Sequence, residues 1–207
     1  MSKIRAVVIC GGRITDYSYI KKQIKSGDTI ICADSGYNHA IKMRLKTDIL
    51  VGDFDSIGEI PKNIKSVQYP TKKDLTDTEI AVEHARNLGF KNFLIIAGIG
   101  TRMDHSLTNI LMLNDFLDKN EYAEIVDEHN KIMITKSELN LNESKGSIVS
   151  LIPLSTCFGV STKNLEYPLN KSTMYVGKGL GVSNVMLEDN SCISIESGTL
   201  LVTISKD

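Results

Sequence analysis

Two short acidic motifs are the parts of this chain best suited to chemistry. The first is Gly52-Asp53-Phe54-Asp55-Ser56, which follows an apolar run. In an extended segment, residues two apart point to the same side, so Asp53 and Asp55 could face one cation. Mg²⁺ prefers such hard oxygen ligands and is usually shared with the phosphates of a substrate. The alternative is an acidic turn that caps the next element, because Asp is common in turns.

The second acidic motif is Lys73-Asp74-Leu75-Thr76-Asp77. Its carboxylates stand at the start of an expected helix, where the helix dipole favours negative charge. Capping by Thr76, with Asp77 in the first turn, explains part of the motif but leaves Asp74 unassigned. Four carboxylates in two tight motifs at expected loop positions favour a divalent-metal site, with Mg²⁺ as the cofactor.

Glycines and cations elsewhere in the chain point to a phosphorylated ligand. Gly11-Gly12 could let backbone N–H groups approach a phosphate. The segment lacks the fingerprints G-x-G-x-x-G and G-K-[ST], and a tight turn explains it equally well. Arg102 could hold phosphate oxygens through two hydrogen bonds. Asp104 is as easily a helix N-cap, and His105 a first-turn residue. The cations nearest to the acids are Lys72, Lys73 and Arg102.

The elements that would position these residues alternate along the first 130 residues. Apolar runs typical of buried parallel strands are Arg5 to Cys10, Thr29 to Ala33, Asp48 to Val51 and Asn92 to Ala97. Helices are expected at about Tyr17 to Ser26, Gly36 to Arg44, Thr76 to Leu88 and His105 to Leu117. Each expected strand ends in a polar or glycine-rich turn, and ligands of open α/β sheets collect at such ends. We therefore expect residues 1–130 to form an α/β domain with right-handed crossovers.

The pattern changes at a polar turn, Asp127-Glu128-His129-Asn130. Beyond it no long amphipathic helix is expected. Short β-rich runs follow at Ser147 to Ile152, Cys157 to Val160, Cys192 to Ile195 and Leu200 to Ser205. Residues 131–207 are therefore expected to form a small all-β domain.

Composition narrows the classes of function. The chain has 24 basic and 25 acidic residues and a net charge of -1, which gives no support to nucleic-acid or anionic-membrane binding. No apolar run reaches the roughly 18 residues of a membrane span, and the first apolar stretch is too short for a signal peptide. The four cysteines have no C-x-x-C spacing, so buried free thiols and a cytoplasmic protein are expected.

Taken together, the motifs resemble those of the thiamine pyrophosphokinase (thiamine diphosphokinase) family. The resemblance covers nearly the whole chain and rests on the order and spacing of Ala33-Asp34-Ser35-Gly36, Gly52-Asp53-Phe54-Asp55-Ser56, Asp74-Leu75-Thr76-Asp77, Gly100-Thr101-Arg102-Met103-Asp104-His105 with Asn109, and Gly181-Val182-Ser183-Asn184. It implies an N-terminal Rossmann-like, mostly parallel sheet with helices on both faces, and a C-terminal all-β sandwich. It also implies transfer of pyrophosphate from ATP to the hydroxyl of thiamine, giving thiamine diphosphate and AMP, by a homodimer with its active site at the subunit interface.

The resemblance also implies roles for individual residues. The metal ligands would be Asp53, Asp55 and Asp77, and the residues acting in catalysis would be Asp74, Asp77, Arg102 and Asp104. ATP would be bound by Gly11, Gly12, Asp34, Ser35, Gly36, Lys73, Arg102, His105 and Asn109. Thiamine would be bound by Asp104, Ser183 and Asn184, the last two reaching it across the dimer interface. Asp74 or Asp104 could accept the hydroxyl proton, with the polyphosphate charge neutralised by Mg²⁺.

Two features depart from the family pattern in the thiamine-binding part. Val185 stands where members often carry Glu after the Ser-Asn pair. The chain also has no Trp, the residue that stacks on the thiamine ring in some members. Tyr167 and Tyr175 are the aromatic candidates for that position.

Two other functions fit parts of the pattern. Asp53-Phe54-Asp55-Ser56 fits the Asp-x-Asp-x-Ser/Thr motif of aspartate-nucleophile phosphohydrolases. In those enzymes the motif usually follows the first strand, whereas here it follows the third expected strand. A nucleotide- or thiamine-sensing module without catalysis would keep the same pocket. Four clustered carboxylates argue against that module, because binding alone seldom needs so many acids beside a polyphosphate.

Overall fold

The structure is a computed structural model that describes residues 5–54, 57, 64–69 and 74–206. It divides into two compact units, Met1–Glu128 and His129–Asp207. The first unit is a mixed α/β structure with parallel strands, and the second is built from antiparallel strands. The functions of residues 1–130 in catalysis and of residues 131–207 in thiamine binding and dimerisation stay predictions.

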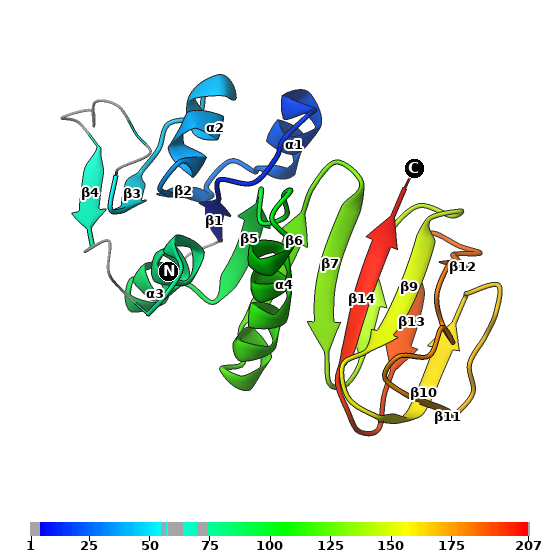
Figure 1. Cartoon of the computed structure of the whole chain (residues 1–207). Coiled ribbons are helices and arrows are strands. Elements are labelled where there is room, and N and C mark those ends of the chain that lie inside the picture. The colour runs from blue at the N-terminus through cyan, green and yellow to red at the C-terminus, as the bar shows by residue number, and fades with distance from the viewer. Residues whose placement is uncertain (1–4, 55–56, 58–63, 70–73, 207) are drawn as a thin grey trace. The chain divides into compact units, whose positions relative to one another are not determined.

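The strands of the first unit form its centre (Figure 1). They are β1 (Ala6–Ile9), β2 (Thr29–Ala33), β3 (Ile49–Gly52), β4 (Lys65–Gln68), β5 (Asn92–Ile96) and β6 (Tyr122–Val126). They lie side by side in the order β6-β5-β1-β2-β3-β4, and every described pair is parallel. All four residues of β1 and of β3 are buried, as expected for strands covered on both faces.

Two strands of this sheet, β6 and β4, were not among the predicted strands. Of the two, β4 carries the weaker apolar signal. Its sequence is Lys-Ser-Val-Gln, and three of its four residues are exposed. It lies at the edge of the sheet, beside β3 alone. An edge strand needs no continuous apolar run, so no such run in the sequence indicates it.

Four helices cover the strands: α1 (Tyr17–Gln23), α2 (Gly36–Lys42), α3 (Asp77–Asn87) and α4 (Met103–Asp118). The predicted capping box of α3 is confirmed, because Glu79 N donates to Thr76 Oγ1 at 3.2 Å and Thr76 N donates to Glu79 Oε2 at 2.8 Å. Helix α4 begins at Met103, with Arg102 as the N-cap residue. The alternative that Asp104 caps this helix is therefore wrong, since Asp104 lies in its first turn.

The helices pack on both faces of the parallel strands. Ile20 of α1 and Ala40 of α2 share one core with alternate strand residues such as Val7 and Ile9. On the opposite face, Phe116 of α4 packs edge-on against Phe93 of β5, with ring centroids 4.9 Å apart. No helix in the described residues is both long enough and apolar enough to cross a membrane.

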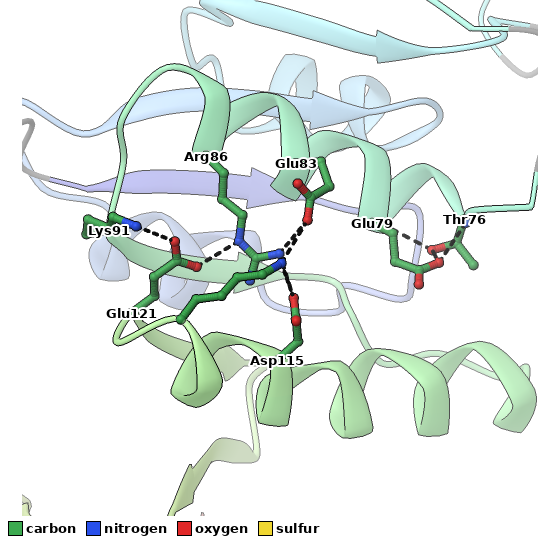
Figure 2. A network of polar contacts seen from close by, with 8 residues as sticks. Thr76, Glu79, Glu83, Arg86, Lys91, Asp115 and Glu121 are labelled. Carbon is green, nitrogen blue, oxygen red and sulfur yellow. Dashed lines mark hydrogen bonds and ion pairs between the residues drawn. The ribbon is translucent and has the colours of Figure 1, made fainter.

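Helices α3 and α4 are joined by Arg86, whose side chain is 9% exposed (Figure 2). Arg86 of α3 donates to Asp115 of α4 at 2.7 Å and to Glu121, just after α4, at 2.7 Å. Its guanidinium also lies over the ring of Phe116, 4.4 Å from the centroid. Because the side chain of Glu121 is almost fully buried, this pairing is needed to offset the cost of removing its charge from water.

The second unit contains the strands β7 (Asn130–Thr135), β8 (Leu139–Leu141), β9 (Ile148–Pro153), β10 (Cys157–Lys163), β11 (Ser172–Met174), β12 (Asn184–Val185), β13 (Ser191–Ser194) and β14 (Leu200–Ser205). They pair antiparallel in two groups, β12-β9-β14-β7 and β11-β10-β13-β8. One core takes residues from both groups, including Val149 and Val202 from the first and Val160 and Ile193 from the second. Strand β7 was not among the predicted runs, although its six residues include a buried apolar stretch. The short strands β8, β11 and β12 were not predicted either, because two or three residues carry no periodic signal.

Candidate functional site

A pocket of about 590 Å³ lies in the first unit, where the parallel strands end and α3 and α4 begin. Segments after β1, β2 and β5 and the first turns of the two helices line it. The lining residues are Cys10, Gly11, Gly12, Arg13, Ala33, Asp34, Ser35, Leu75, Thr76, Asp77, Thr78, Ala97, Gly98, Gly100, Thr101, Arg102, His105 and Asn109. This is the position at which ligands bind in open α/β sheets.

The glycine turn after β1 is fixed against the end of β5. Gly12 N donates to Ala97 O at 2.9 Å, and Arg13 N donates to Ile99 O at 3.2 Å. A Cβ on Gly12 would collide with the carbonyl oxygens of Ala97 and Ile99. Glycine is therefore required here for a close approach of two backbones. The predicted ATP-binding residues Gly11 and Gly12 both line the pocket.

A second turn follows β2 and brings a carboxylate to the pocket. Asp34 has the left-handed backbone conformation (φ 43°), is 8% exposed, and donates its N–H to Val51 O at 2.7 Å. Ser35 beside it also lines the pocket, and its role in ATP binding stays a prediction. Gly36 does not line it. A Cβ at that position would collide with the carbonyl of Ile9, so Gly36 allows α2 to pack over β1.

Polar side chains on α4 hold the loop between β5 and this helix. Asn109 is buried, and its Nδ2 donates to Gly98 O at 2.7 Å. Ser106 Oγ accepts from Gly100 N at 3.1 Å and lies 3.0 Å from Arg102 O. Asn109 was predicted to bind ATP, and it also shapes the pocket wall. Ser106 was missed, although its place directly after the Gly100 to His105 motif was a usable signal.

Arg102 and Asp104 form an exposed ion pair at the pocket. Arg102 Nη2 lies 2.5 Å from Asp104 Oδ2, and Arg102 lines the pocket whereas Asp104 does not. The hydrogen bond from Arg102 lowers the pKa of Asp104 to about 2. The same hydrogen bond raises the pKa of Arg102. Both side chains therefore stay charged throughout the physiological pH range.

The predicted metal ligands are only partly described by the structure. Asp77 lines the pocket from the first turn of α3, Asp53 is half-buried directly after β3, and Asp74 is exposed. Asp55, and the predicted ATP-binding residue Lys73, lie outside the described residues. Within the described part of the chain, no three His, Cys, Asp or Glu side chains form a cluster that could hold a metal ion. The donors are nevertheless carboxylates, and Mg²⁺ fits them because it takes one or two carboxylates and completes its shell with water and phosphate.

The side chain of His39 contacts the backbone of the glycine turn at Gly12. Its Nε2 lies 2.7 Å from Gly12 O, and its Nδ1 lies 2.8 Å from the hydroxyl of Tyr17. Burial lowers the pKa of His39, which keeps the ring neutral. A neutral ring can donate to the Gly12 carbonyl and accept from Tyr17 at the same time. This role could not be predicted from the sequence, because α2 brings His39 to Gly12 only in the folded chain.

Cys10 is the one thiol among the pocket-lining residues, and it is not suited to act as a nucleophile. Burial raises its pKa to about 12, so the thiol stays protonated. Its Sγ accepts a hydrogen bond from Thr78 Oγ1 at 3.3 Å. All four cysteines are free, as expected.

The residues predicted to bind thiamine lie in the second unit, apart from Asp104. Asn184 is buried, and its side chain bonds to both backbone groups of Tyr167, accepting from N at 3.0 Å and donating to O at 2.7 Å. Ser183 is exposed and has the left-handed backbone conformation (φ 58°). Tyr167 and Tyr175 are 65% and 55% exposed. Asn184 thus holds the segment that carries Tyr167.

The first unit has parallel strands with a charged pocket at their carboxyl ends, and the second unit is antiparallel. These features define a class of two-unit α/β proteins whose ligand site lies at the strand ends. Residues 20–126 match the family model "Thiamin pyrophosphokinase, catalytic domain", and residues 131–200 match "Thiamin pyrophosphokinase, vitamin B1 binding domain". The chain belongs to the thiamin pyrophosphokinase family. The resemblance drawn from the sequence motifs is therefore confirmed.

Relatives from several kingdoms support this assignment. The chain is 29% identical over 165 residues to thiamine pyrophosphokinase of Bacillus subtilis, covering 75% of this chain and 77% of that protein. It is 26% identical over 172 residues to thiamin pyrophosphokinase 1 of Caenorhabditis elegans, covering 74% and 70%. The fold is that of the crystal structure of the Bacillus subtilis enzyme, with a TM-score of 0.88 at 23% identity over 99% of this chain and 100% of that one. For thiamin pyrophosphokinase of Candida albicans the TM-score is 0.77 at 17% identity, over 98% and 89%.

Proposed function

We propose that this protein is a thiamine diphosphokinase, which transfers pyrophosphate from ATP to the hydroxyl of thiamine and releases AMP. One observation carries the proposal: both family domains match in order, and most of the residues that line the charged pocket, all but residues 10–13, fall inside the catalytic match. Arg102 is suited to a polyphosphate, and the pocket carboxylates are suited to its metal ion. The backbone N–H groups of Gly12 and Arg13 already donate to Ala97 O and Ile99 O, so they are not the donors that the glycine turn was expected to offer a phosphate.

The site residues take the roles that the resemblance implies. ATP would be held by Gly11, Gly12, Asp34, Ser35, Gly36, Lys73, Arg102, His105 and Asn109. Mg²⁺ would be held by Asp53, Asp55 and Asp77 and, when bound, supplies charge neutralisation to the polyphosphate. Asp74, Asp77, Arg102 and Asp104 would align the reactants, which is the main requirement of phosphoryl transfer.

Thiamine binding would fall to Asp104, Ser183 and Asn184, in a homodimer with its active site at the subunit interface. A group of exposed apolar side chains close together in the sequence of the second unit supports a protein interface there, because monomers rarely expose large contiguous apolar patches. The group includes Tyr175, Val176, Leu180 and Val182, each about half exposed or more. For the fold of the two units, we propose a Rossmann-like domain for the first and a β-sandwich for the second.

We also propose a cytoplasmic protein that binds neither nucleic acid nor membranes. The net charge of -1 offers no general attraction to anionic polymers or surfaces. Four free cysteines, three of them buried, suit a reducing compartment.

The deciding experiment mixes the protein with Mg²⁺, ATP and thiamine, and measures AMP and thiamine diphosphate by chromatography. We expect both products in equal amounts from the wild type, and none from Asp77→Asn. Asp118→Asn, at the far end of α4, is the matched control and should keep full activity. Near-normal activity of Asp77→Asn would overturn the assignment of Asp77.

Two other outcomes would favour the competing functions. Release of inorganic phosphate without AMP, together with a trapped phosphoenzyme, would favour the phosphohydrolase. The position of Asp53 directly after β3 speaks against that enzyme class, whose motif usually follows the first strand. Binding of ATP with no product under varied metals and pH would favour the sensor.

A further inference from the structure

Charged residues are sorted by sign along the carboxyl ends of the parallel strands. Strands β5, β1, β2 and β3 lie side by side in this order. The first charged residue after each of them is Arg102, Arg13, Asp34 and Asp53, respectively. The cations thus follow one pair of neighbouring strands and the carboxylates follow the next pair. A polyanion with a bound cation matches such an arrangement.

The two arginines on the positive side differ in what already neutralises them. Arg102 is paired with Asp104 at 2.5 Å. Arg13 also lines the pocket and is exposed, but in the described part of the chain its guanidinium has no hydrogen-bond or ion-pair partner. Arg13 therefore offers the pocket an uncompensated charge with five N–H donors.

The backbone that carries Arg13 is held from three directions. Its own N–H donates to Ile99 O at 3.2 Å, and His39 lies 2.7 Å from the carbonyl of the preceding Gly12. On the following side, Glu128 Oε1 accepts hydrogen bonds from the backbone N–H groups of Thr15 and Asp16. A free cationic head on a fixed backbone binds an anion with little loss of backbone entropy.

We propose that Arg13 binds the polyphosphate chain of ATP. The motifs that pointed to ATP did not include this residue, and the role goes beyond the proposed function while resting on it for the identity of the nucleotide. A guanidinium at the end of β1, whose backbone is bonded to the segment after β5, can hold phosphate oxygens and leave the carboxylates after β2 and β3 to the metal ion.

The test measures binding without turnover, by calorimetry with Mg²⁺ and either ATP or inorganic tripolyphosphate, and without thiamine. For Arg13→Met we expect about a tenfold or greater loss of affinity for both ligands, since a hydrogen-bonded charge pair is lost. Arg13→Lys should lose less, because it keeps the charge but not the fork. Arg44→Met removes an exposed arginine outside the pocket and should bind both ligands like the wild type.

Each of the other results would overturn the role of Arg13. Unchanged ATP binding by Arg13→Met would show that the side chain makes no contact. Weaker ATP binding with unchanged tripolyphosphate binding would place Arg13 against the nucleoside. Failure of the proposed function is separate: a wild type that binds ATP but forms no thiamine diphosphate overturns that function, and the binding series still decides on Arg13. Equal melting temperatures would show that the variants are folded.

Discussion

At the scale of single residues, the ion pair at the start of α4 limits which groups can take a proton. Asp104 was one of two candidates to accept the thiamine hydroxyl proton. The hydrogen bond from Arg102 lowers the pKa of Asp104 to about 2, and a carboxylate with so low a pKa is a weak base. Asp104 is therefore better suited to holding Arg102 in place than to removing a proton.

Replacement of Arg102 tests this interpretation. We expect Arg102→Gln to lower kcat/KM by about tenfold or more, because a charge-assisted contact to phosphate is lost. Without its partner the pKa of Asp104 returns toward the ordinary 3.8, which is still below the assay range. The profile of kcat/KM, measured between about pH 5 and pH 9, should therefore fall in height and keep its shape. A shift of its acid limb would show that Asp104 acts as the base.

At the scale of elements, the pocket depends on the close approach of the ends of β1 and β5. Gly12 makes this approach possible, since its N–H bonds to Ala97 O and its missing side chain leaves room for two carbonyl oxygens. The first turn of α3 is fixed differently, by the reciprocal bonds between Thr76 and Glu79. Asp77 projects from that turn, so the cap also determines where a carboxylate meets the pocket.

A methyl group at Gly12 should separate the two strand ends. We expect Gly12→Ala to lower the free energy of unfolding by about 1–3 kcal/mol, the usual cost of overpacking, and to abolish ATP binding. Gly179→Ala is the matched control, because a Cβ there meets no atom within 4 Å. Urea unfolding and calorimetry measure both effects. Normal ATP binding by Gly12→Ala would show that the turn adapts without loss of the pocket.

Removal of the α3 cap should have a smaller effect. Thr76→Ala leaves the Glu79 N–H without its acceptor, so we expect the free energy of unfolding to fall by about 1 kcal/mol. Thr76→Ser keeps the hydroxyl and should be nearly neutral. If the cap also places Asp77, Thr76→Ala should lower kcat more than Thr76→Ser does. Equal stability of the two variants would show that the cap contributes nothing measurable.

At the scale of the whole molecule, the sequence predicted elements better than it predicted partners. The apolar runs of β1, β2, β3 and β5 and the capping box of α3 follow from local chemistry, and the structure has them at the expected places. Whether a charge is neutralised by a neighbour depends on the folded chain. For that reason the sequence could suggest Arg102 but could not single out Arg13 as the arginine with no described partner. The contact between His39 and the carbonyl of Gly12 could not be predicted for the same reason.

Two histidines of the first unit link stability to pH. Burial lowers the pKa of His39 and of His84 below the ordinary 6.5. Lys42 lowers the pKa of His39 further, whereas the bond to Gly12 and the charge of Glu128 oppose the change. Below pH 6.5 the unfolded chain therefore binds more protons than the folded chain. The contribution of these histidines to the free energy of unfolding should be at its full value above about pH 6.5. It should fall as the pH drops below that value.

The carboxylates with lowered pKa values should add a second loss of stability only below their ordinary pKa values. They are Glu83, Asp104, Asp115 and Glu128, with ordinary values of 4.5, 3.8, 3.8 and 4.5. The double variant His39→Gln, His84→Gln separates the two ranges, because Gln does not titrate and can still donate to Gly12 O. We expect urea unfolding followed by circular dichroism to show a loss of stability between about pH 7 and pH 5 in the wild type. The double variant should show little loss there and the same loss at lower pH. A wild-type slope retained by the double variant would assign the effect to other groups.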